Sequence, residues 1–579
     1  MKREGRLQIN WRRIWYMLCF FALGIIDQRR GSAPGNVQMT AANLTGVAIA
    51  AMLVPSLQLK RFRHVIYGIW TIIAAIGGSV ACTWGWEHYL YRGQWVSAVL
   101  VIAVWGYLIL YILHLCVSGE EESQILRRKV RKPFFWCVEA MLLFMLFSVH
   151  EGYMPLMLLV LAGGFYLIGI PKTAREDFFQ GMLNGIICWF FVQQIIAFGF
   201  RPYDYVRYRG LYSGETQNGL FYMIAYCAFL VKWLWLKDSG RHRVLSWLSF
   251  FLAAGCVSFT LFTGGRSPLV GIALATVVVL IWYDIVWRKS FYRLLLHGVL
   301  GLACVVVTFP VVYGCIRYLP TVLHHPVWFE GEYNGNNVMY NDPWDSPKYI
   351  SFETAVDINI GRILQVIGID IRKWTSEIPG SAWVMRVHAQ EPGELEESGE
   401  LEESGEQGEP GDTEENPFTL PDTERGNSVD VRKVIHVYCI QHLNWRGHAK
   451  RAGFYIFDGL LIDHAHNMFL EIGYNHGIPA GLLFVGIYFY SLIWSFRKRR
   501  LEGMLCVTFL LAILGYGMFE MAVVTGQITV SLMGILFCLA GEEGEEPETA
   551  MGSRQKEEAA VTEICEIESS VGENTSAGV

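Results

Sequence analysis

Long apolar runs separated by short polar segments recur along most of the 579-residue chain. A membrane-crossing helix needs about 20 apolar residues to span about 30 Å of hydrocarbon, and most of these runs approach that length. Hydropathy, turn residues and charged punctuation together predict about fourteen spans. They are expected near 12–27, 40–58, 65–86, 95–117, 134–150, 153–170, 178–200, 219–236, 244–262, 268–287, 294–317, 466–495, 503–520 and 525–541. The pattern therefore predicts an all-α polytopic membrane protein.

Lys and Arg are concentrated in every second predicted loop, and this alternation predicts which side of the membrane each loop faces. If the N-terminus is cytoplasmic, six basic segments are cytoplasmic too, as the positive-inside rule requires: "LKRFRH", "RRKVRK", "PKTARED", "KDSGRHR", "WRKSFYR" and "FRKRR". The polar segment 542–579 would then be a disordered cytoplasmic tail. The segments left outside are 199–218, the tight turn 262–268 and the long region 318–463.

The extracytoplasmic region 318–463 separates spans 1 to 11, in 1–317, from spans 12 to 14, in 464–541. Its acidic insert near 390–428 contains the direct repeat "GELEES" and too few apolar residues to bury a core, so we expect it to be disordered. The segment that follows, "VDVRKVIHVYCIQHL", predicts an amphipathic helix on the outer, membrane-facing surface. Its apolar residues at helical spacing are Val431, Val434, Ile435 and Tyr438.

The composition supports a membrane protein, because 53% of the residues are hydrophobic and only 17% are charged. Soluble domains average about 25% charged residues. The 13 cysteines lie mainly in apolar runs, where they act as small hydrophobes. The first apolar run lacks a convincing cleavage site, so we interpret it as a retained helix.

Arginines stand in two of the predicted outer segments, where the positive-inside rule expects few. Arg207 and Arg209 lie in the first, and Arg266 lies in the turn "FTGGRSP" beside Gly264 and Gly265. A single exposed Arg commonly extends to lipid headgroups, but Arg266 is at the junction of two apolar helices and needs a partner there. Arginine pairs in a bidentate way with phosphate or carboxylate oxygens. The two segments therefore predict an anion site.

Histidines stand at the start of a late apolar run, in the stretch "DHAHNMFLEIGYNHGIPAGLLF" from 463 to 484. Asp463, His464 and Asn467 are suited to capping a helix. His466 follows just inside the span, where an ionisable group is a functional candidate, and a neutral imidazole can accept a proton near pH 7. Glu471 is off the face of His466, so we expect it to be structural.

A metal site is a weaker interpretation of the same stretch. It would use Asp463, His464, His466 and His476. Residues two apart on a helix point in different directions, so the His464–His466 spacing does not favour ligation. No metal ligand set is predicted.

External arginines beside a single base fit a lipid-linked sugar pyrophosphate. Arginines can neutralise the pyrophosphate as it leaves, in place of a divalent cation. The lipid chain requires a site at the membrane surface, and the acceptor hydroxyl is the group that must lose a proton. This chemistry predicts glycosyl transfer outside the membrane.

Four segments resemble motifs of the O-antigen ligase and O-antigen polymerase family. "HNMFLEIGYNHGIPAGLLF" resembles its HNxxL…xGxxG helix, and "FTGGRSPLVGIALA" is similar to its SRxx segment. "RYRGLYSGETQNGL" resembles its RxxGxxxxxN external loop, with Gln217-Asn218 in place of Pro-Asn. "DVRKVIHVYCIQHLNWRGH" is similar to its Arg-led amphipathic segment. The four occur in the family's order and cover roughly 180–540.

The resemblance implies a GT-C-like helical fold in the bacterial cytoplasmic membrane. It also implies metal-independent transfer of a glycan from undecaprenyl pyrophosphate to an acceptor hydroxyl, on the outer face. Arg207, with Arg209 as its rival, and Arg266 would hold the pyrophosphate, and His466 would be the catalytic base. Supporting roles would fall to His464, Asn467, Asn218, Arg432 and Arg446.

The expected partners are an undecaprenyl-pyrophosphate-linked glycan donor, a glycan, lipid-glycan or protein acceptor, and the lipid bilayer. Neither a cofactor nor nucleic acid is expected. Ligase and polymerase share their donor chemistry and are not distinguished by these residues. The alternative from another class is a flippase or transporter for a lipid-linked oligosaccharide or polysaccharide, whose arginines would line a path.

Overall fold

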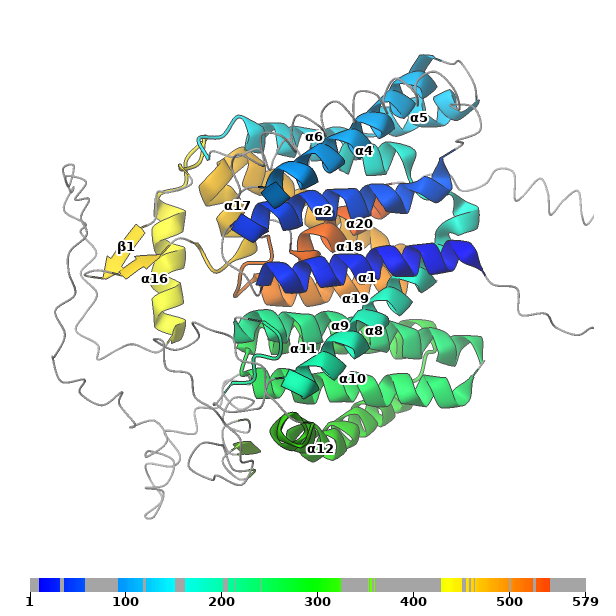
Figure 1. Cartoon of the computed structure of the whole chain (residues 1–579), viewed down its shortest axis with the longest axis vertical. Coiled ribbons are helices and arrows are strands. Elements are labelled where there is room, and N and C mark those ends of the chain that lie inside the picture. Colours follow the sequence, from blue (N-terminus) through cyan, green and yellow to red (C-terminus); the bar gives the residue numbers. More distant parts are fainter. Residues whose placement is uncertain are drawn as a thin grey trace, which may run out of the picture.

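The structure is a computed structural model that describes most of the predicted membrane region (Figure 1). The described residues are 10–31, 36–57, 92–117, 121–150, 162–200, 207–212, 214–240, 242–323, 428–449, 454–457, 460–462, 464–498, 501–523 and 527–541, with isolated positions between 352 and 359. The predicted span 65–86, the first half of the span 153–170, the acidic insert, the tail 542–579 and Asp463 lie outside the described residues.

The described chain is helical, apart from one short hairpin. The elements are α1 (Trp11–Gly31), α2 (Asn36–Leu53), η1 (Val54–Ser56), α4 (Arg92–Val117), α5 (Glu121–Arg131), α6 (Pro133–Leu146), η4 (Lys172–Ala174), α8 (Arg175–Phe200), α9 (Glu215–Ser239), α10 (Arg243–Thr263), α11 (Arg266–Leu280), the π-helical turn η5 (Ile281–Trp287), α12 (Phe291–Val322), α16 (Ser428–Gln441), β1 (Phe454–Phe457), β2 (Leu460–Ile462), α17 (Met468–His476), α18 (Ile478–Arg497), α19 (Leu501–Gly517) and α20 (Ile528–Gly541).

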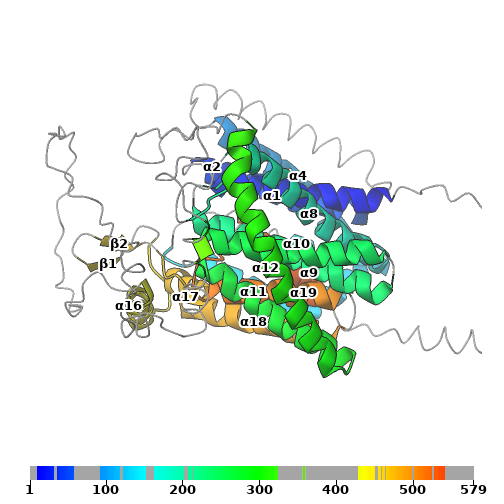
Figure 2. The ribbon, with the colours of Figure 1, turned by 90° about the horizontal axis from the view of Figure 1, so that it is seen from below.

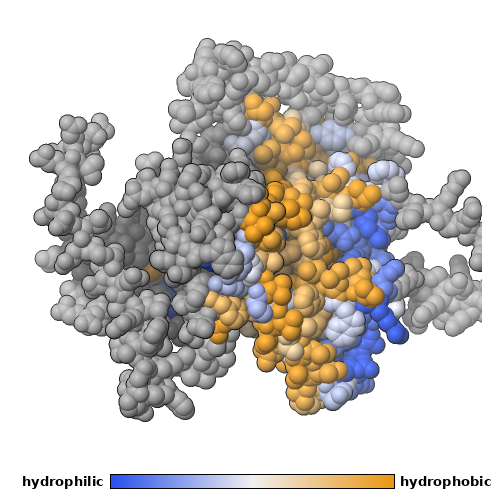
Figure 3. All heavy atoms as spheres, turned by 60° about the horizontal axis from the view of Figure 1, so that its bottom comes forward, coloured by the Kyte–Doolittle hydropathy of each residue, from blue (hydrophilic) through white to orange (hydrophobic). Residues whose placement is uncertain are grey.

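Seven of the described helices are long and apolar enough to cross a membrane. They are Val96–Cys116, Lys172–Gly199, Glu215–Ser239, Arg243–Thr263, Arg266–Trp287, Phe291–Pro320 and Ile478–Arg497, and four shorter apolar helices accompany them. α12 exposes apolar side chains over much of its length, including Val299, Leu302 and Val306. Figure 3 shows this hydrophobic belt, bordered by a hydrophilic rim at the end away from α16. These features describe a helical, multi-pass membrane protein.

The helices alternate in direction, so the same end of the bundle collects several chain turns (Figures 1 and 2). α1, α8, α10 and α19 end there, and α9, α11, α18 and α20 begin there. α16, α17 and the antiparallel β1–β2 hairpin also lie at this end, which we call the site end. The predicted arginine segments and the histidine stretch are therefore at one end of the bundle.

α19 separates two groups of helices. On one side it packs against α9 and α11, and on the other against α18 and α20; α18 in turn packs against α6. The contact with α11 is backbone to backbone. A Cβ added to Gly271 would lie 2.5 Å from the carbonyl oxygen of Ala512, and one added to Gly515 would lie 2.7 Å from the Cα of Gly271. Side chains at either position would push the two helices apart.

The span predicted at 466–495 is wrong as a single helix. The chain forms α17, breaks at Gly477, and continues as α18. Gly477 has φ +95°, and a Cβ there would lie 2.3 Å from the carbonyl oxygen of Trp445, so only glycine fits. The segment Asn444–His448 crosses this break, with Ile478 N donating to Asn444 O at 2.9 Å and His448 N donating to Asn475 O at 3.2 Å.

The amphipathic helix predicted after the acidic insert is α16, but its apolar face packs on protein. Ile435 and Cys439 are buried together with Ala465 and Tyr474, next to α17. α16 stands across the end of the bundle in Figure 1. The helix therefore holds its polar residues against the histidine stretch.

Candidate functional site

The two arginine segments are joined by a backbone hydrogen bond. Tyr208 N donates to the carbonyl oxygen of Phe262 at 2.8 Å, two residues before the glycine turn that leads to Arg266. Asn218 is fully buried at the start of α9, and its Nδ2 donates to the carbonyl oxygen of Tyr208 at 3.1 Å. Asn218 therefore fixes the loop that carries Arg207 and Arg209 against the end of α10.

Two helix N-termini lie beside these arginines. α9 begins after Gly214 and α11 after Gly265, and neither helix is capped by a side chain. The first N–H groups of a helix carry the positive end of its dipole and attract anions. Arg266 is the first residue of α11 and is half-buried. Because Glu215 stands in the first turn of α9, the positive potential is concentrated at the start of α11, beside Arg266.

Arg207 and Arg209 differ in their surroundings. Arg209 is half-buried, and its Nε and Nη2 both lie 3.0 Å from Glu215 Oε1. Arg207 is exposed, and within the described part of the chain no ion pair involves it. Glu215 largely matches the positive charge of Arg209, whereas Arg207 has no carboxylate partner among the described residues.

The histidine stretch is held in a turn at the mouth of α17. Asn467 Oδ1 accepts hydrogen bonds from Phe469 N at 3.0 Å and Leu470 N at 3.2 Å, which confirms Asn467 as the helix cap. His466 has φ +48°, a left-handed conformation that costs a non-glycine residue about 1 kcal/mol or more. Contacts on both sides of this turn hold it in place.

Glu471 is one of those contacts, so its predicted structural role is confirmed. The side chain is buried, and its Oε2 accepts a hydrogen bond from Ala465 N at 2.6 Å. Its Oε1 accepts from Asn475 Nδ2 at 2.6 Å. The carboxylate ties the residue before His466 to the body of α17.

A carboxylate that sequence analysis missed links the catalytic candidate to α16. His466 Nδ1 lies 3.4 Å from Glu520 Oε2, and Arg432 Nη2 donates to Glu520 Oε1 at 2.6 Å. All three side chains are partly buried, at 23% exposed for His466, 15% for Glu520 and 26% for Arg432. In a neutral ring, Nδ1–H then donates to Glu520, and Nε2 keeps its lone pair for a substrate proton.

Two further histidines lie beside His466. The rings of His464 and His466 are 4.1 Å apart between centroids. His436, one turn after Arg432 in α16, was also missed. Burial lowers the pKa of His436, the charges of His466 and Arg432 add to this, and backbone groups of Ala465 and His466 oppose it. His436 therefore favours its neutral form more than a free imidazole does.

The arginine group and the histidine group lie on the same side of the crossing between α11 and α19. Arg266 is five residues from Gly271, and Glu520 is five residues from Gly515, where α11 and α19 touch. Arg266 begins α11 and Glu520 follows the end of α19 at Gly517, so both lie on the site-end side of that crossing. Asn467 Nδ2 also donates to the carbonyl oxygen of Met518 at 3.2 Å, which places the histidine turn on the end of α19.

Two predicted residues lie apart from this group. Arg446 is exposed in the segment that crosses Gly477, where its carbonyl oxygen accepts from Val149 N at 2.8 Å. His476 is partly buried, with its Nδ1 3.0 Å from Ser148 Oγ, beside the ring of His150. Among the described residues no group of three or more His, Cys, Asp or Glu could hold a metal ion.

Comparisons of the chain with protein-family models, curated proteins and solved structures found no match. The function of the protein is therefore inferred from the geometry of the site and from the four sequence segments that the fold brings to one end of the bundle.

Proposed function

We propose that the protein is a membrane glycosyltransferase of the O-antigen ligase or polymerase type, which transfers a glycan from undecaprenyl pyrophosphate to an acceptor hydroxyl. The observation that carries the proposal is that the Arg207 loop and the Arg266 turn, which are hydrogen-bonded to each other, lie at the same end of the bundle as the His466–Glu520–Arg432 contact. An anion site beside a positioned base is what this reaction requires.

The chain's own residues account for each step of the transfer. His466 Nε2 takes the proton of the acceptor hydroxyl, whose oxygen forms a new bond to the anomeric carbon of the donor sugar. The bond from that carbon to the pyrophosphate breaks, and the pyrophosphate leaves with the electron pair. Arg207 and Arg266 stabilise the growing negative charge. Glu520 stabilises the imidazolium that forms, and direct displacement would invert the anomeric centre.

The proposed placement is the bacterial cytoplasmic membrane, with the site end outside and both termini in the cytoplasm. The exposed cations Arg243, Lys289 and Arg293 at the opposite end support this orientation. We also propose about fourteen spans and a GT-C-like arrangement, since the described helices alternate in direction as that count requires. No cofactor is part of the proposal.

A transporter is the second candidate, because one chain of ionisable groups does lie inside the helices. His297 Nδ1 is 2.6 Å from Asp284 Oδ2, and Lys237 Nζ contacts the other ring nitrogen. Asp284 and His297 are both buried. Lys237 is two residues from the end of α9, at the end away from the site. Lys232, five residues further into α9, donates to Gln180 and Asn184. The cationic groups of α9 therefore lie within its last eight residues, and we interpret the cluster as a local structural contact.

The two candidates are separated by protein in detergent. A glycosyltransferase makes a new glycosidic bond from a polyprenyl-pyrophosphate oligosaccharide and an acceptor, whereas a transporter makes none. We expect a larger glycan with the wild type and at least 100-fold less with Arg266→Ala. Lys289→Ala, a cation removed from the opposite end, is the matched control and should transfer normally. Equal transfer by Arg266→Ala would contradict the proposed pyrophosphate site.

A further inference from the structure

A buried carboxylate near the end of α1 joins two distant parts of the site end. Asp27 is only 4% exposed. Its Oδ2 accepts a hydrogen bond from Tyr212 Oη at 3.2 Å, and its Oδ1 accepts one from the backbone N of Ile528, the first residue of α20, at 3.0 Å. Ionisable side chains within membrane helices are rare and commonly functional. The two partners of Asp27 indicate what its function is.

On one side, Asp27 holds the loop that carries Arg207. The start of this loop is hydrogen-bonded to α9 and α10, and its end is hydrogen-bonded to α1. Tyr212 is 1% exposed and donates to Asp27. The next residue of α1, Gln28, donates through Nε2 to the carbonyl oxygen of Leu211 at 3.3 Å. The end of the loop therefore follows the position of α1.

On the other side, Asp27 holds the start of α20 and, through it, the segment that carries Glu520. The first N–H groups of a helix have no partner within the helix, and a carboxylate beside them also meets the positive end of the helix dipole. In the first turn of α20, Thr529 Oγ1 donates to the carbonyl oxygen of Ala522 at 2.7 Å, two residues after Glu520. Glu520 in turn faces Nδ1 of His466. Hydrogen bonds and short stretches of backbone thus connect Asp27 to the proposed base.

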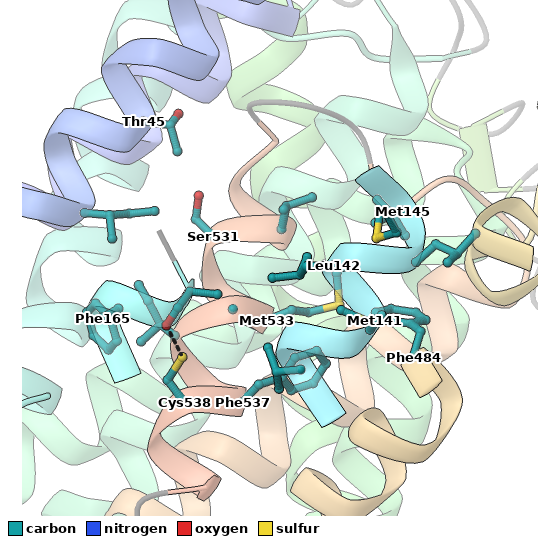
Figure 4. Close-up of a pocket in the computed structure, with 18 of the residues that line it drawn as sticks. Thr45, Met141, Leu142, Met145, Phe165, Phe484, Ser531, Met533, Phe537 and Cys538 are labelled. Atoms are coloured by element: carbon teal, nitrogen blue, oxygen red, sulfur yellow. Dashed lines mark hydrogen bonds between the residues drawn. The ribbon is translucent and has the colours of Figure 1, made fainter. Parts of the chain in front are cut away.

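Hydrogen bonds from other elements hold α20 near both of its ends. Asp27 accepts from the first residue, and Tyr166 Oη donates to the carbonyl oxygen of the last residue, Gly541, at 3.2 Å. Between them, one flank of α20 borders an apolar cavity of about 120 Å³, lined by side chains that include Met533 and Phe537 (Figure 4). Apolar contacts are non-directional, whereas a hydrogen bond fixes both distance and angle. The position of the start of α20 therefore depends on Asp27.

We propose that Asp27 is a positioning residue for the transfer reaction, which sets the Arg207 loop and the Glu520 segment relative to each other. It acts through Tyr212 and Ile528, which are 185 and 501 residues away along the chain. The inference rests on the proposed function, because the loop is taken to hold the pyrophosphate and Glu520 to face the base.

Tyr212→Phe tests the link to the arginine loop, because it removes the hydroxyl that donates to Asp27 and keeps the ring. Tyr166→Phe is the matched control, since it removes a buried hydroxyl with a contact of the same length at the other end of α20. We expect Tyr212→Phe to raise the KM for the polyprenyl-pyrophosphate donor about tenfold with little change in kcat. Tyr166→Phe should change neither. Equal donor KM values in the two variants would overturn the proposal.

Two substitutions of Asp27 separate its two contacts. Asn caps helices as well as Asp does, so Asp27→Asn can keep the contact with Ile528, but its Nδ2 cannot accept from Tyr212. Its donor KM should rise as in Tyr212→Phe, and combining the two substitutions should add nothing further. Asp27→Ala removes both contacts and should also lower kcat about tenfold. Additive effects of Asp27→Asn and Tyr212→Phe, or a wild-type kcat in folded Asp27→Ala, would overturn the proposal. The Asn and Phe variants decide the question if Asp27→Ala does not fold.

Hydrogen exchange of backbone amides keeps this inference separate from the reaction itself. In Asp27→Ala, the peptides that contain Tyr212 and Ile528 should both exchange faster than in the wild type, whereas in Tyr212→Phe only the Tyr212 peptide should. Tyr166→Phe should leave both unchanged. This pattern supports Asp27 as the link even in a protein that transfers no glycan, in which case only the proposed function fails. Unchanged exchange of either peptide in Asp27→Ala overturns the inference even if wild-type transfer is normal.

Discussion

Replacing Glu520 by Gln tests the contact that sequence analysis missed. The substitution keeps the size of the side chain and removes the negative charge that faces His466 and Arg432. The charge matters most after His466 has taken the acceptor proton, because a carboxylate then faces an imidazolium. We therefore expect a lower kcat with little change in the KM for the donor.

The magnitude follows from the geometry. A hydrogen bond to a charged group contributes about 1.5–3 kcal/mol. The His466–Glu520 distance is 3.4 Å, and the two side chains are 23% and 15% exposed, so we take about 2 kcal/mol from the lower part of that range. Because about 1.4 kcal/mol corresponds to a factor of ten in rate, kcat should fall about 30-fold.

The assay is steady-state transfer from a polyprenyl-pyrophosphate oligosaccharide, with kcat and KM measured separately. Glu520→Asp keeps the charge and should recover most of the rate. Glu502→Gln is the matched control, since Glu502 lies at the other end of α19 and pairs with Arg175 at 3.7 Å. A kcat within twofold of the wild type in folded Glu520→Gln would refute the proposed role of the carboxylate.

Three further predictions concern the rest of the site end. Arg207→Ala should raise the KM for the donor at least tenfold and more than Arg209→Ala does, because Arg209 is already paired; equal effects in the same assay would contradict this. Asn467→Ala removes the cap of α17 and should cost about 1 kcal/mol of stability, seen as a lower unfolding temperature. Burial lowers the pKa of His476 to about 4 from 6.5, so the unfolded state takes up the proton first. Stability should therefore be full above pH 6.5 and fall as the pH drops toward 4, by up to about 3 kcal/mol. His476→Asn should flatten this dependence of the unfolding temperature, whereas replacing the exposed His442 should not.

The sequence predicted the helices and the end at which the charged residues gather, because both depend on local patterns. Apolar length identifies a span, and the alternation of Lys and Arg assigns loops to sides. Arg266 and Asn467 could be found this way, since each stands at a helix start that the chain itself marks. The same local signals identified Glu471 as structural.

The remaining features depend on contacts between distant parts of the chain. Glu520 is 88 residues from Arg432 and 54 from His466, so no spacing connects them. The only local signal was an acidic residue at the end of an apolar run, in "GYGMFEMAVV". The break at Gly477 could not be predicted for the same reason. At this break the helix contacts the segment Asn444–His448, which ends 29 residues earlier in the chain. His436 could not be identified from the sequence either, because it comes close to His466 only when α16 packs on the histidine turn.

The most direct test of the account is a time course with purified protein, a polyprenyl-pyrophosphate oligosaccharide and an acceptor, in the presence of EDTA. Released polyprenyl pyrophosphate and newly formed glycosidic bonds are counted together, for the wild type and for His466→Ala. We predict equal amounts of both products, an inverted anomeric centre, and a loss of at least 1,000-fold in His466→Ala. Wild-type rates in His466→Ala, or a reaction that stops with EDTA, would contradict the central claim.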